Sequence, residues 1–180
     1  MTKILDSLRH GPASGAEIDK LEALAGAPLP GDYRAFLKDH NGGRPIPDSF
    51  PLLYPDGQVG EAQLVCFFPL WASDCDDGGP NLIDWPLYCA WNSVHGDADD
   101  AEEWRQILGD AEETVLPIGH DGFGNYVLLS LSGAAAGGVA MIDHDGGGLF
   151  RLADSFAAFV EGLRPSQHGN DGWHWDDVEL

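Results

Sequence analysis

The sequence predicts a single domain of the α+β class, in which helices pack against a sheet. Apolar residues recur at helical spacing near the N-terminus and again after residue 155, whereas short β-prone runs separated by turn residues fill residues 115–152. A length of 180 residues suits one domain. The apolar fraction of 43%, with six Trp, indicates an ordered core in spite of 24 Gly and 12 Pro.

Two helices are expected within the first 26 residues. Met1–His10 fits a short amphipathic helix that ends at Gly11-Pro12. Its apolar positions are Ile4, Leu5 and Leu8. Ser14 begins the second helix, because Glu17 follows it at the spacing of a capping box, and Gly26 ends this helix. Its apolar positions are Ile18, Leu21, Leu24 and Ala25.

A third helix is expected after Leu29-Pro30, since Pro suits a first helical position, where the N–H has no partner. Asp32 would then lie in the first turn, where a negative charge interacts favourably with the helix dipole. The buried positions are Tyr33, Phe36 and Leu37. Asn41-Gly42-Gly43 would end the helix, because these residues tolerate the positive φ of a left-handed C-cap.

Strands are expected in much of the remaining chain. Residues 44–60 are rich in Pro and Gly and suit a loop with one short strand, whereas Gln63–Leu70 is apolar and β-prone and suits a buried strand. Later strands are expected at Val115–Gly119, Asn125–Leu131, Val139–Asp143 and Leu149–Leu152. Asp154 or Ser155 would cap a last helix. Its core positions are Phe156, Phe159, Val160 and Leu163.

The net charge limits the classes of partner. Thirty Asp and Glu stand against nine Lys and Arg, which gives a formal net charge of −21. Such a field repels nucleic acid, whose binding requires cations to displace phosphate counterions, and it repels anionic membranes. It attracts basic proteins and accelerates their encounter in a salt-sensitive manner. A role of the acidity in solubility alone is the alternative.

Residues 96–113 hold a dense acidic cluster that only Arg105 opposes. Asp99 and Glu103 would be like charges at i,i+4 of a helix, and tolerance of such a pair favours a surface that meets a basic partner. Trp104 suits either an aromatic anchor or a core position. The candidate partner-binding residues are Asp97, Asp99, Asp100, Glu102, Glu103 and Trp104, with Asp74, Asp76 and Asp77 of an acidic Gly-rich loop.

No residue is assigned to catalysis, to a cofactor or to a metal. Asp143-His144-Asp145 and His120-Asp121 combine carboxylates with imidazoles, but both suit turns better than a metal site. The loop at Asp74 lacks the spacing of a calcium loop, no G-x-S-x-G motif occurs, and Gly122-Phe123-Gly124 lacks the helix of a dinucleotide fingerprint. A metal-dependent hydrolase built on His120 and His144 is the least favoured hypothesis.

Cysteine content and the N-terminus favour a cytoplasmic location. The three cysteines, Cys66, Cys75 and Cys89, form no C-x-x-C pair, and such a sparse, odd set fits a reducing compartment. Cys66 and Cys89 have apolar neighbours and suit inert core positions. Residues 1–9 lack the apolar run of a signal peptide, and no stretch approaches the roughly 18 apolar residues of a membrane span.

The order of these motifs resembles the pattern of the SUKH superfamily, the Smi/Knr-type domain. Its first part is an Ile-x-x-Leu-Glu helix, a Leu-Pro-x-Asp-Tyr helix entry and an Asn-Gly-Gly end. These positions are filled by Ile18, Leu21, Glu22, Leu29, Pro30, Asp32, Tyr33, Phe36, Leu37, Asn41, Gly42 and Gly43. Its second part is an apolar Pro-Ile segment, Asp-Gly-x-Gly-Asn, a strand pair, a turn and a helix. These positions are Pro117, Ile118, Asp121, Gly122, Gly124, Asn125, Val139, Asp143, His144, Asp145 and the helix from Phe156.

The resemblance divides the chain into a SUKH-like domain at residues 1–164 and an acidic, Trp-containing tail at residues 165–180. It implies a central, mostly antiparallel sheet flanked by helices. Residues 45–114 do not align with the pattern, and the family's variable parts would hold specificity. In the tail, Trp173, His174 and Trp175 suit a docked terminus or, second, a partner contact.

For function, the resemblance implies a bacterial immunity protein of a polymorphic toxin system, with no catalysis of its own. Such a protein would bind and neutralise a cognate toxin, most often a nuclease, and the acidic surface would occlude the active site of that basic partner. A regulatory protein-binding module of the same fold, with no toxin partner, is the alternative. The sequence does not indicate the oligomeric state.

Overall fold

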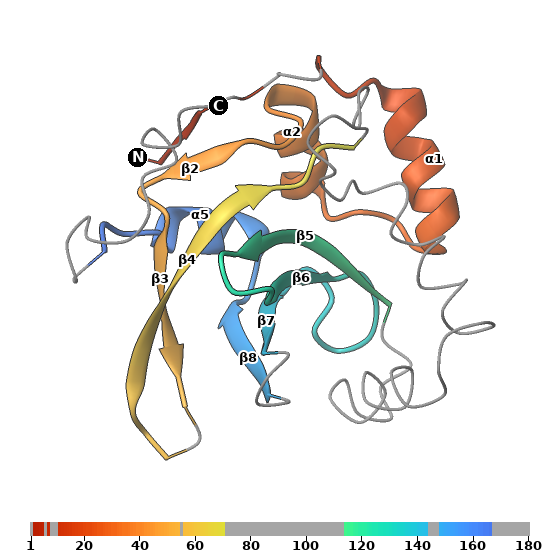
Figure 1. Ribbon diagram of the computed structural model, residues 1–180. Helices are drawn as coiled ribbons and strands as arrows, with labels where there is room; N and C mark the ends of the chain where they lie inside the picture. The colour runs from red at the N-terminus through yellow and green to blue at the C-terminus, as the bar shows by residue number, and fades with distance from the viewer. Residues whose placement is uncertain are drawn as a thin grey trace.

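The computed structural model describes residues 2–5, 7, 11–54, 56–70, 114–143 and 148–166. In this part of the chain, helices and strands form an α+β domain, as the sequence predicts (Figure 1). The elements are β1 (Lys3–Leu5), α1 (Gly15–Ala25), α2 (Gly31–Asp39), β2 (Arg44–Ile46), β3 (Ser49–Leu53), β4 (Val59–Phe67), β5 (Val115–Asp121), β6 (Tyr126–Ser130), β7 (Val139–Asp143), β8 (Gly148–Ala153) and α5 (Phe156–Gly162).

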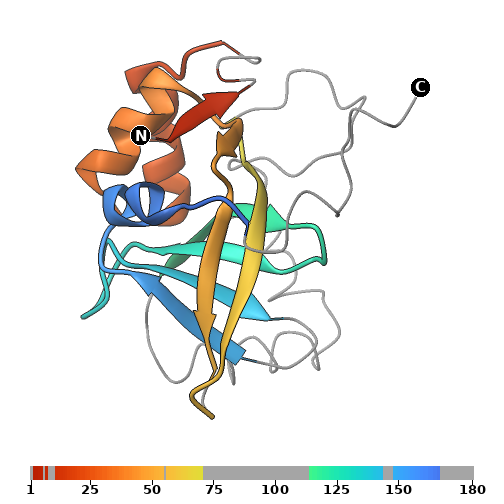
Figure 2. The ribbon, with the colours of Figure 1, turned by 90° about the vertical axis from the view of Figure 1, so that its left-hand side faces the viewer.

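The strands β3 to β8 form one antiparallel sheet in which each strand pairs with its neighbours in sequence. The sheet curls, so that its edge strands β3 and β8 come into contact. Beside this contact the rings of Tyr54 and Phe150 meet edge to face at 5.3 Å. β1 and β2 form a separate two-stranded antiparallel sheet. Figure 2 shows the three helices gathered on one side of the large sheet.

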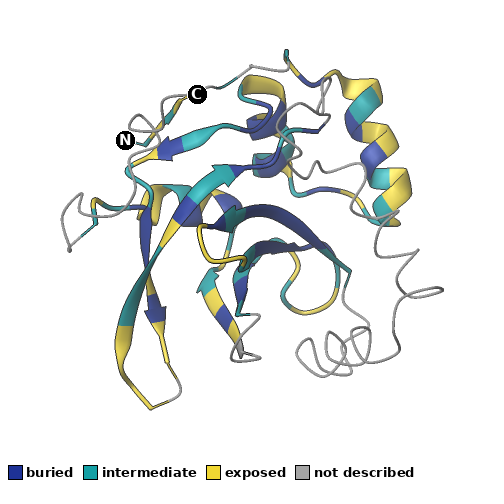
Figure 3. Ribbon diagram, viewed as in Figure 1, coloured by how far each residue is buried: buried dark blue, intermediate teal, exposed yellow. Residues whose placement is uncertain are grey.

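An aromatic cluster joins α2 and α5 to the sheet. The ring of Phe36 on α2 lies 4.9 Å from Phe67 of β4 and 5.0 Å from Phe156 of α5, both edge to face. Tyr33 contacts Phe156 at 4.8 Å. All four residues are buried (Figure 3). Each edge-to-face pair adds about 0.5–1.5 kcal/mol to the stability gained from burial. The apolar positions predicted for the two helices therefore meet each other.

The Asp32 carboxylate connects the first turns of α2 and α5. Its Oδ1 accepts a hydrogen bond from the Tyr33 N–H at 2.9 Å, and its Oδ2 accepts one from the Ala157 N–H at 2.9 Å. The latter N–H lies in the first turn of α5, which Ser155 also caps through the Ala158 N–H. One negative charge thus faces the positive ends of two helix dipoles.

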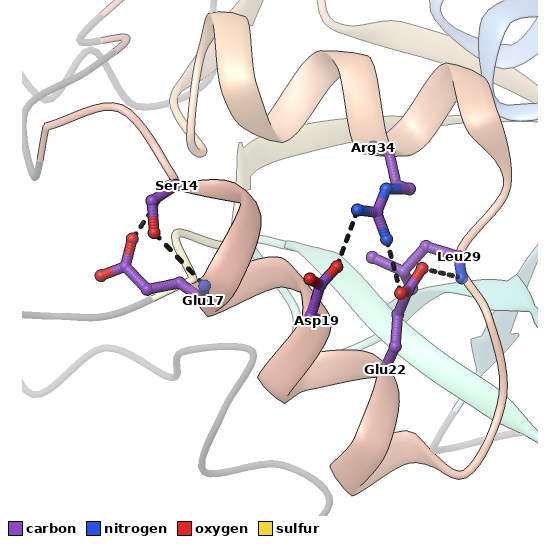
Figure 4. A network of polar contacts seen from close by, with 6 residues as sticks. All are labelled: Ser14, Glu17, Asp19, Glu22, Leu29 and Arg34. Atoms are coloured by element: carbon purple, nitrogen blue, oxygen red, sulfur yellow. Dashed lines mark hydrogen bonds and ion pairs between the residues drawn. The ribbon is translucent and has the colours of Figure 1, made fainter.

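Polar contacts fix α1 against the entry of α2 (Figure 4). The predicted capping box is present, because Ser14 and Glu17 exchange two hydrogen bonds. Glu22 Oε1 accepts from the Leu29 N–H at 2.8 Å, and Glu22 Oε2 pairs with Arg34 Nη1 at 2.5 Å. Asp19 takes the other guanidinium nitrogen of Arg34 at 2.9 Å. Glu22 of α1 therefore binds both the turn before α2, through the Leu29 N–H, and α2 itself, through Arg34.

The structure corrects three sequence-based predictions. The helix expected over Met1–His10 is wrong, because Lys3–Leu5 is strand β1, paired with β2. Residues 44–60 hold β2, β3 and the start of β4 rather than one short strand. The strand expected at Gln63–Leu70 is β4, displaced toward the N-terminus to Val59–Phe67. Partner strands decide these boundaries, and local sequence spacing does not report them.

Within the described residues, no helix combines the length and the apolar character needed to cross a membrane.

Gly43 lies where a side chain has no room. Its φ is +115°, and an added Cβ would stand 2.5 Å from the Leu5 carbonyl oxygen and 2.8 Å from Ile4 Cγ2. Gly26 also has a positive φ, +72°, but open space around it. We expect Gly26→Ala to cost about 1–2 kcal/mol from backbone strain. Gly43→Ala should cost a further 1–3 kcal/mol, roughly, from overpacking. Urea unfolding of both variants checks this, and equal losses would contradict the close approach of β1.

The Glu22 contacts make a pH-dependent contribution to stability. The hydrogen bond from Arg34 lowers the pKa of the Glu22 carboxyl, and the Leu29 N–H adds to this effect. A lowered folded-state pKa stabilises the fold above the unfolded pKa of about 4.3, and the stabilisation disappears as pH falls through the folded pKa. Glu22→Gln should therefore destabilise the protein most at pH 7, and the loss should decrease as pH falls below about 4.

Urea titrations of the Glu22→Gln variant at several pH values measure this difference. Asp19→Asn is the matched control, because the Asp19 side chain is 66% exposed and its pair with the same guanidinium is expected to contribute little. A loss for Glu22→Gln that is the same at pH 3 and pH 7 would show that the charge of Glu22 is not what stabilises the turn.

Candidate protein-binding surface

The candidate partner-binding residues belong to one stretch, residues 71–113, which we call the acidic segment. All of them lie outside the described residues: Asp74, Asp76, Asp77, Asp97, Asp99, Asp100, Glu102, Glu103 and Trp104. The acidic segment contains twelve Asp and Glu and one basic residue, Arg105. It thus holds 12 of the 30 acidic residues in less than a quarter of the chain. The structure describes the two points at which it leaves and re-enters the fold.

Asn41 holds the first of these points. Its amide Nδ2 donates to the Gly11 carbonyl oxygen at 2.7 Å, and its Oδ1 accepts from the Leu70 N–H at 2.9 Å. The residue is 5% exposed and has a φ of +48°. Because a buried amide that loses its partners is costly, this side chain fixes the position of Leu70, the last described residue before the acidic segment.

A backbone bridge supports the same point. The Gly43 N–H donates to the Phe67 carbonyl oxygen at 3.2 Å, and the Phe67 N–H donates to the Gly43 carbonyl oxygen at 2.8 Å. This pairing attaches the start of β2 to the end of β4. The Asn-Gly-Gly motif therefore ends α2, as predicted, and also secures the exit of the acidic segment.

Hydrogen bonds to the β6–β7 connection hold the second point, at Thr114. The Thr114 N–H donates to Ser132 Oγ at 2.7 Å, and the Leu131 N–H donates to the Thr114 carbonyl oxygen at 2.7 Å. Beyond the paired part of β4, the Phe68 N–H donates to the Ile118 carbonyl oxygen of β5 at 2.9 Å. The acidic segment thus leaves and re-enters between two strands that are neighbours in the sheet.

Asp121-Gly122-Phe123-Gly124-Asn125 forms the turn between β5 and β6. Asp121 is 3% exposed, and its Oδ1 accepts from the backbone N–H groups of Phe123 at 2.8 Å and Asn125 at 2.9 Å. Its Oδ2 accepts from Asn125 Nδ2 at 2.7 Å. Both carboxylate oxygens therefore serve the turn, as the preference of Asp and Gly for turns predicts.

The described residues offer no metal site that uses His120. This side chain stacks on Phe68 at 5.5 Å, and its Nδ1 lies 2.7 Å from the Asp121 carbonyl oxygen. No group of three or more His, Cys, Asp or Glu in the described ranges could hold a metal ion. His144 and Asp145, which the hydrolase hypothesis also needs, lie outside these ranges.

Cys66 is partly buried on β4, and burial raises the pKa of its thiol to about 11. At neutral pH it is therefore a thiol and a poor nucleophile, as predicted. Cys75 and Cys89 lie outside the described residues.

The Asn41 amide connects Gly11 to Leu70, a role that the sequence did not predict. The Asn-Gly-Gly motif predicted a helix end with positive φ. Three consecutive glycines would adopt that backbone conformation equally well, so the prediction gave no role to the Asn side chain. The signal was the choice of Asn over Gly at the first position, since Asn tolerates positive φ and brings an amide. Its partners Gly11 and Leu70 stand 30 and 29 residues away, so spacing alone could not identify them.

Comparison with known families gives one result. The model of a family described as the SMI1 / KNR4 family (SUKH-1) matches residues 12–162. The match covers most of the chain and includes α1, α2, β2 to β8 and α5. It confirms the resemblance drawn from the motifs. No individual curated protein matches the sequence significantly.

Variants of Asn41 separate its backbone role from its side-chain role. Asn41→Gly keeps the freedom to adopt positive φ but removes the amide, whereas Asn41→Ala removes both. We expect Asn41→Gly to lose about 2–4 kcal/mol, because one buried and one partly buried backbone group lose their partners, and Asn41→Ala to lose about 1 kcal/mol more. Urea unfolding measures both losses. Wild-type stability of Asn41→Gly would contradict the bridging role of the amide.

Proposed function

Because the chain belongs to the SMI1 / KNR4 family (SUKH-1), we propose that it is a bacterial immunity protein that binds and neutralises a cognate nuclease toxin in the cytoplasm. Membership of the family implies action through protein–protein interaction. The observation that supports the more specific proposal is the charge of the acidic segment, whose sequence contains twelve Asp and Glu and one Arg.

A nuclease binds the phosphate backbone through Lys and Arg, so its active site is a basic cleft. An acidic surface of complementary shape would occupy that cleft and exclude the substrate. Opposite charges also steer the two proteins together, with association rate constants that fall as salt screens the charges. Neutralisation by occlusion requires no catalytic residue, no metal and no cofactor in this chain.

The proposed contact residues are the candidates of the acidic segment. Asp97, Asp99, Asp100, Glu102 and Glu103 would meet the basic cleft, with Asp74, Asp76 and Asp77 as a second acidic group. Trp104 stands beside Glu103 and would be the aromatic anchor that such an interface commonly contains. The fixed ends at Leu70 and Thr114 support this assignment, because they restrict where the acidic segment leaves the sheet and so lower the entropy cost of binding.

Affinity capture from the native cell tests the function directly. The full chain is immobilised, and bound proteins are eluted at low and at high salt and identified by mass spectrometry. Stoichiometric capture of one basic protein whose nuclease activity the chain inhibits would support the proposal. Capture of a non-toxic protein would favour the regulatory module, and capture of none at either salt would count against an acidic binding surface.

Charge reversal tests the contact residues. Asp99→Lys, Asp100→Lys and Glu103→Lys together should leave the melting temperature nearly unchanged, since surface charges contribute little to stability, and should slow association with the captured toxin by at least tenfold, roughly. Stopped-flow or surface-based kinetics at several salt concentrations measures this rate.

The matched control carries the same change in net charge at exposed sites of the described fold, Asp39→Lys, Asp154→Lys and Glu161→Lys. Its association rate should fall much less, because it alters the overall charge and leaves the proposed contact intact. Equal effects of the two triple variants would show that net charge alone, and not the acidic segment, guides the encounter.

A further inference from the structure

The small β1–β2 sheet has one face toward the core and one face toward solvent. Ile4 lies opposite Pro45, and both are turned inward, with Pro45 buried and Ile4 packed against the core. Lys3 pairs with Ile46, and Leu5 pairs with Arg44. Directly opposite residues in antiparallel strands project to the same side, so these four side chains share the outward face. We call Lys3, Leu5, Arg44 and Ile46 the β1–β2 face.

The β1–β2 face combines two exposed aliphatic side chains with two basic residues, which are scarce in this chain. Leu5 is 39% exposed and Ile46 is 50% exposed. The two basic residues are two of only nine Lys and Arg in a chain with a net charge of −21. A two-stranded sheet is marginally stable in water by itself. A segment that covers the aliphatic pair and brings carboxylates to Lys3 would stabilise this sheet.

The C-terminal chain leaves the described fold beside this face. Thr2 Oγ1 donates to the Val160 carbonyl oxygen at 2.9 Å, which places the start of β1 at the end of α5. Arg164 exchanges two backbone hydrogen bonds with Ser49, at 2.9 and 3.0 Å, in an antiparallel bridge. Arg164 therefore lies close to the connection between β2 and β3, and Ser166 Oγ donates to Glu61 Oε1 of β4 at 2.8 Å. Only two residues separate Ser49 from Ile46, and Figure 1 shows β2 and β3 meeting above the end of α5.

The composition of residues 167–180 complements the β1–β2 face. This tail contains four carboxylates and no Lys or Arg. One residue separates Trp173 from Trp175. In an extended chain, side chains at this spacing project to the same side and can cover one surface. Asp176 and Asp177 follow them directly. The ten residues that follow Ser166, up to Asp176, can span about 33 Å, which is long enough to reach the β1–β2 face, since Ile46 is only three residues from Ser49.

We propose that the C-terminal tail docks on the β1–β2 face of its own chain. Trp173 and Trp175 cover Leu5 and Ile46, and the carboxylates of Asp176, Asp177 and Glu179 face Lys3. This intramolecular contact does not depend on the immunity function. It gives the tail a structural role in holding the N-terminal strand.

Zero-length cross-linking of the full chain tests the docking. A carbodiimide joins a carboxylate and an amine in direct contact, forming an amide with loss of water. The chain has three lysines, Lys3 on β1, Lys20 on α1 and Lys38 on α2, so the last two are internal controls. In the monomer fraction, tail peptides should be linked to Lys3 in clear excess over Lys20 and Lys38, and the excess should decrease at high salt.

Two variants establish the cause of the cross-link. Ile46→Ser removes an exposed aliphatic side chain from the β1–β2 face, and Trp173→Ala with Trp175→Ala removes the tail rings. Each should reduce the Lys3 link to the level at Lys20 and Lys38. Leu24→Ser is the matched control, since Leu24 is 36% exposed on α1, away from this face, and the Lys3 link should persist.

Two outcomes would overturn the proposal. Equal tail links at the three lysines, or none at Lys3, in protein that unfolds cooperatively in urea would show that the tail does not dock there. Links to Lys3 confined to a dimer fraction would assign the face to a second copy of the chain instead. Lys3→Arg, which keeps the charge and removes the reactive amine, identifies the linked residue.

Discussion

The fold depends on the Asn41 amide and the backbone turn that it permits. A positive φ at Asn41 and at the two following glycines reverses the chain at the end of α2 and directs it into β2. The amide then joins Gly11, ahead of α1, to Leu70, after β4. The absence of a side chain at Gly43 lets β1 approach on one side while Gly43 pairs with Phe67 on the other. Residues 41–43 therefore contact both the small β1–β2 sheet and the large sheet directly after the end of α2.

Three acidic residues of the family pattern form hydrogen bonds within the fold. Asp32, Glu22 and Asp121 each accept hydrogen bonds from backbone N–H groups, which belong respectively to α5, to the entry of α2 and to the β5–β6 turn. A carboxylate engaged in this way cannot turn toward another protein without losing its hydrogen bonds to the backbone. These three residues of the family pattern therefore stabilise the scaffold.

Local chemistry explains which elements were predictable. The capping box at Ser14 and the turn at Asp121 involve partners within four residues, so the sequence reports them directly. β1 is different, because three residues carry no periodicity and their conformation is set by pairing with β2, 40 residues away. The hydrogen bond from the Ala157 N–H of α5 to Asp32 joins residues 125 positions apart, so no local sequence pattern predicts it. The acidic cluster was found by composition alone, and composition gives charge but not geometry, so its role as a contact surface stays a prediction.

The acidic segment lies in the connection between two adjacent strands, β4 and β5. β4 and β5 are adjacent antiparallel strands, which two to five residues, roughly, suffice to connect. The chain places 47 residues there instead, and 43 of them form the acidic segment. The entropy cost of closing a loop rises only with the logarithm of its length, so a long insertion costs little stability once its ends are fixed. Asn41 and Ser132 fix those ends with side-chain hydrogen bonds that do not depend on the sequence between them. Under the proposed function, the charge and aromatic content of the acidic segment could then change with the partner while these two attachment points stay the same.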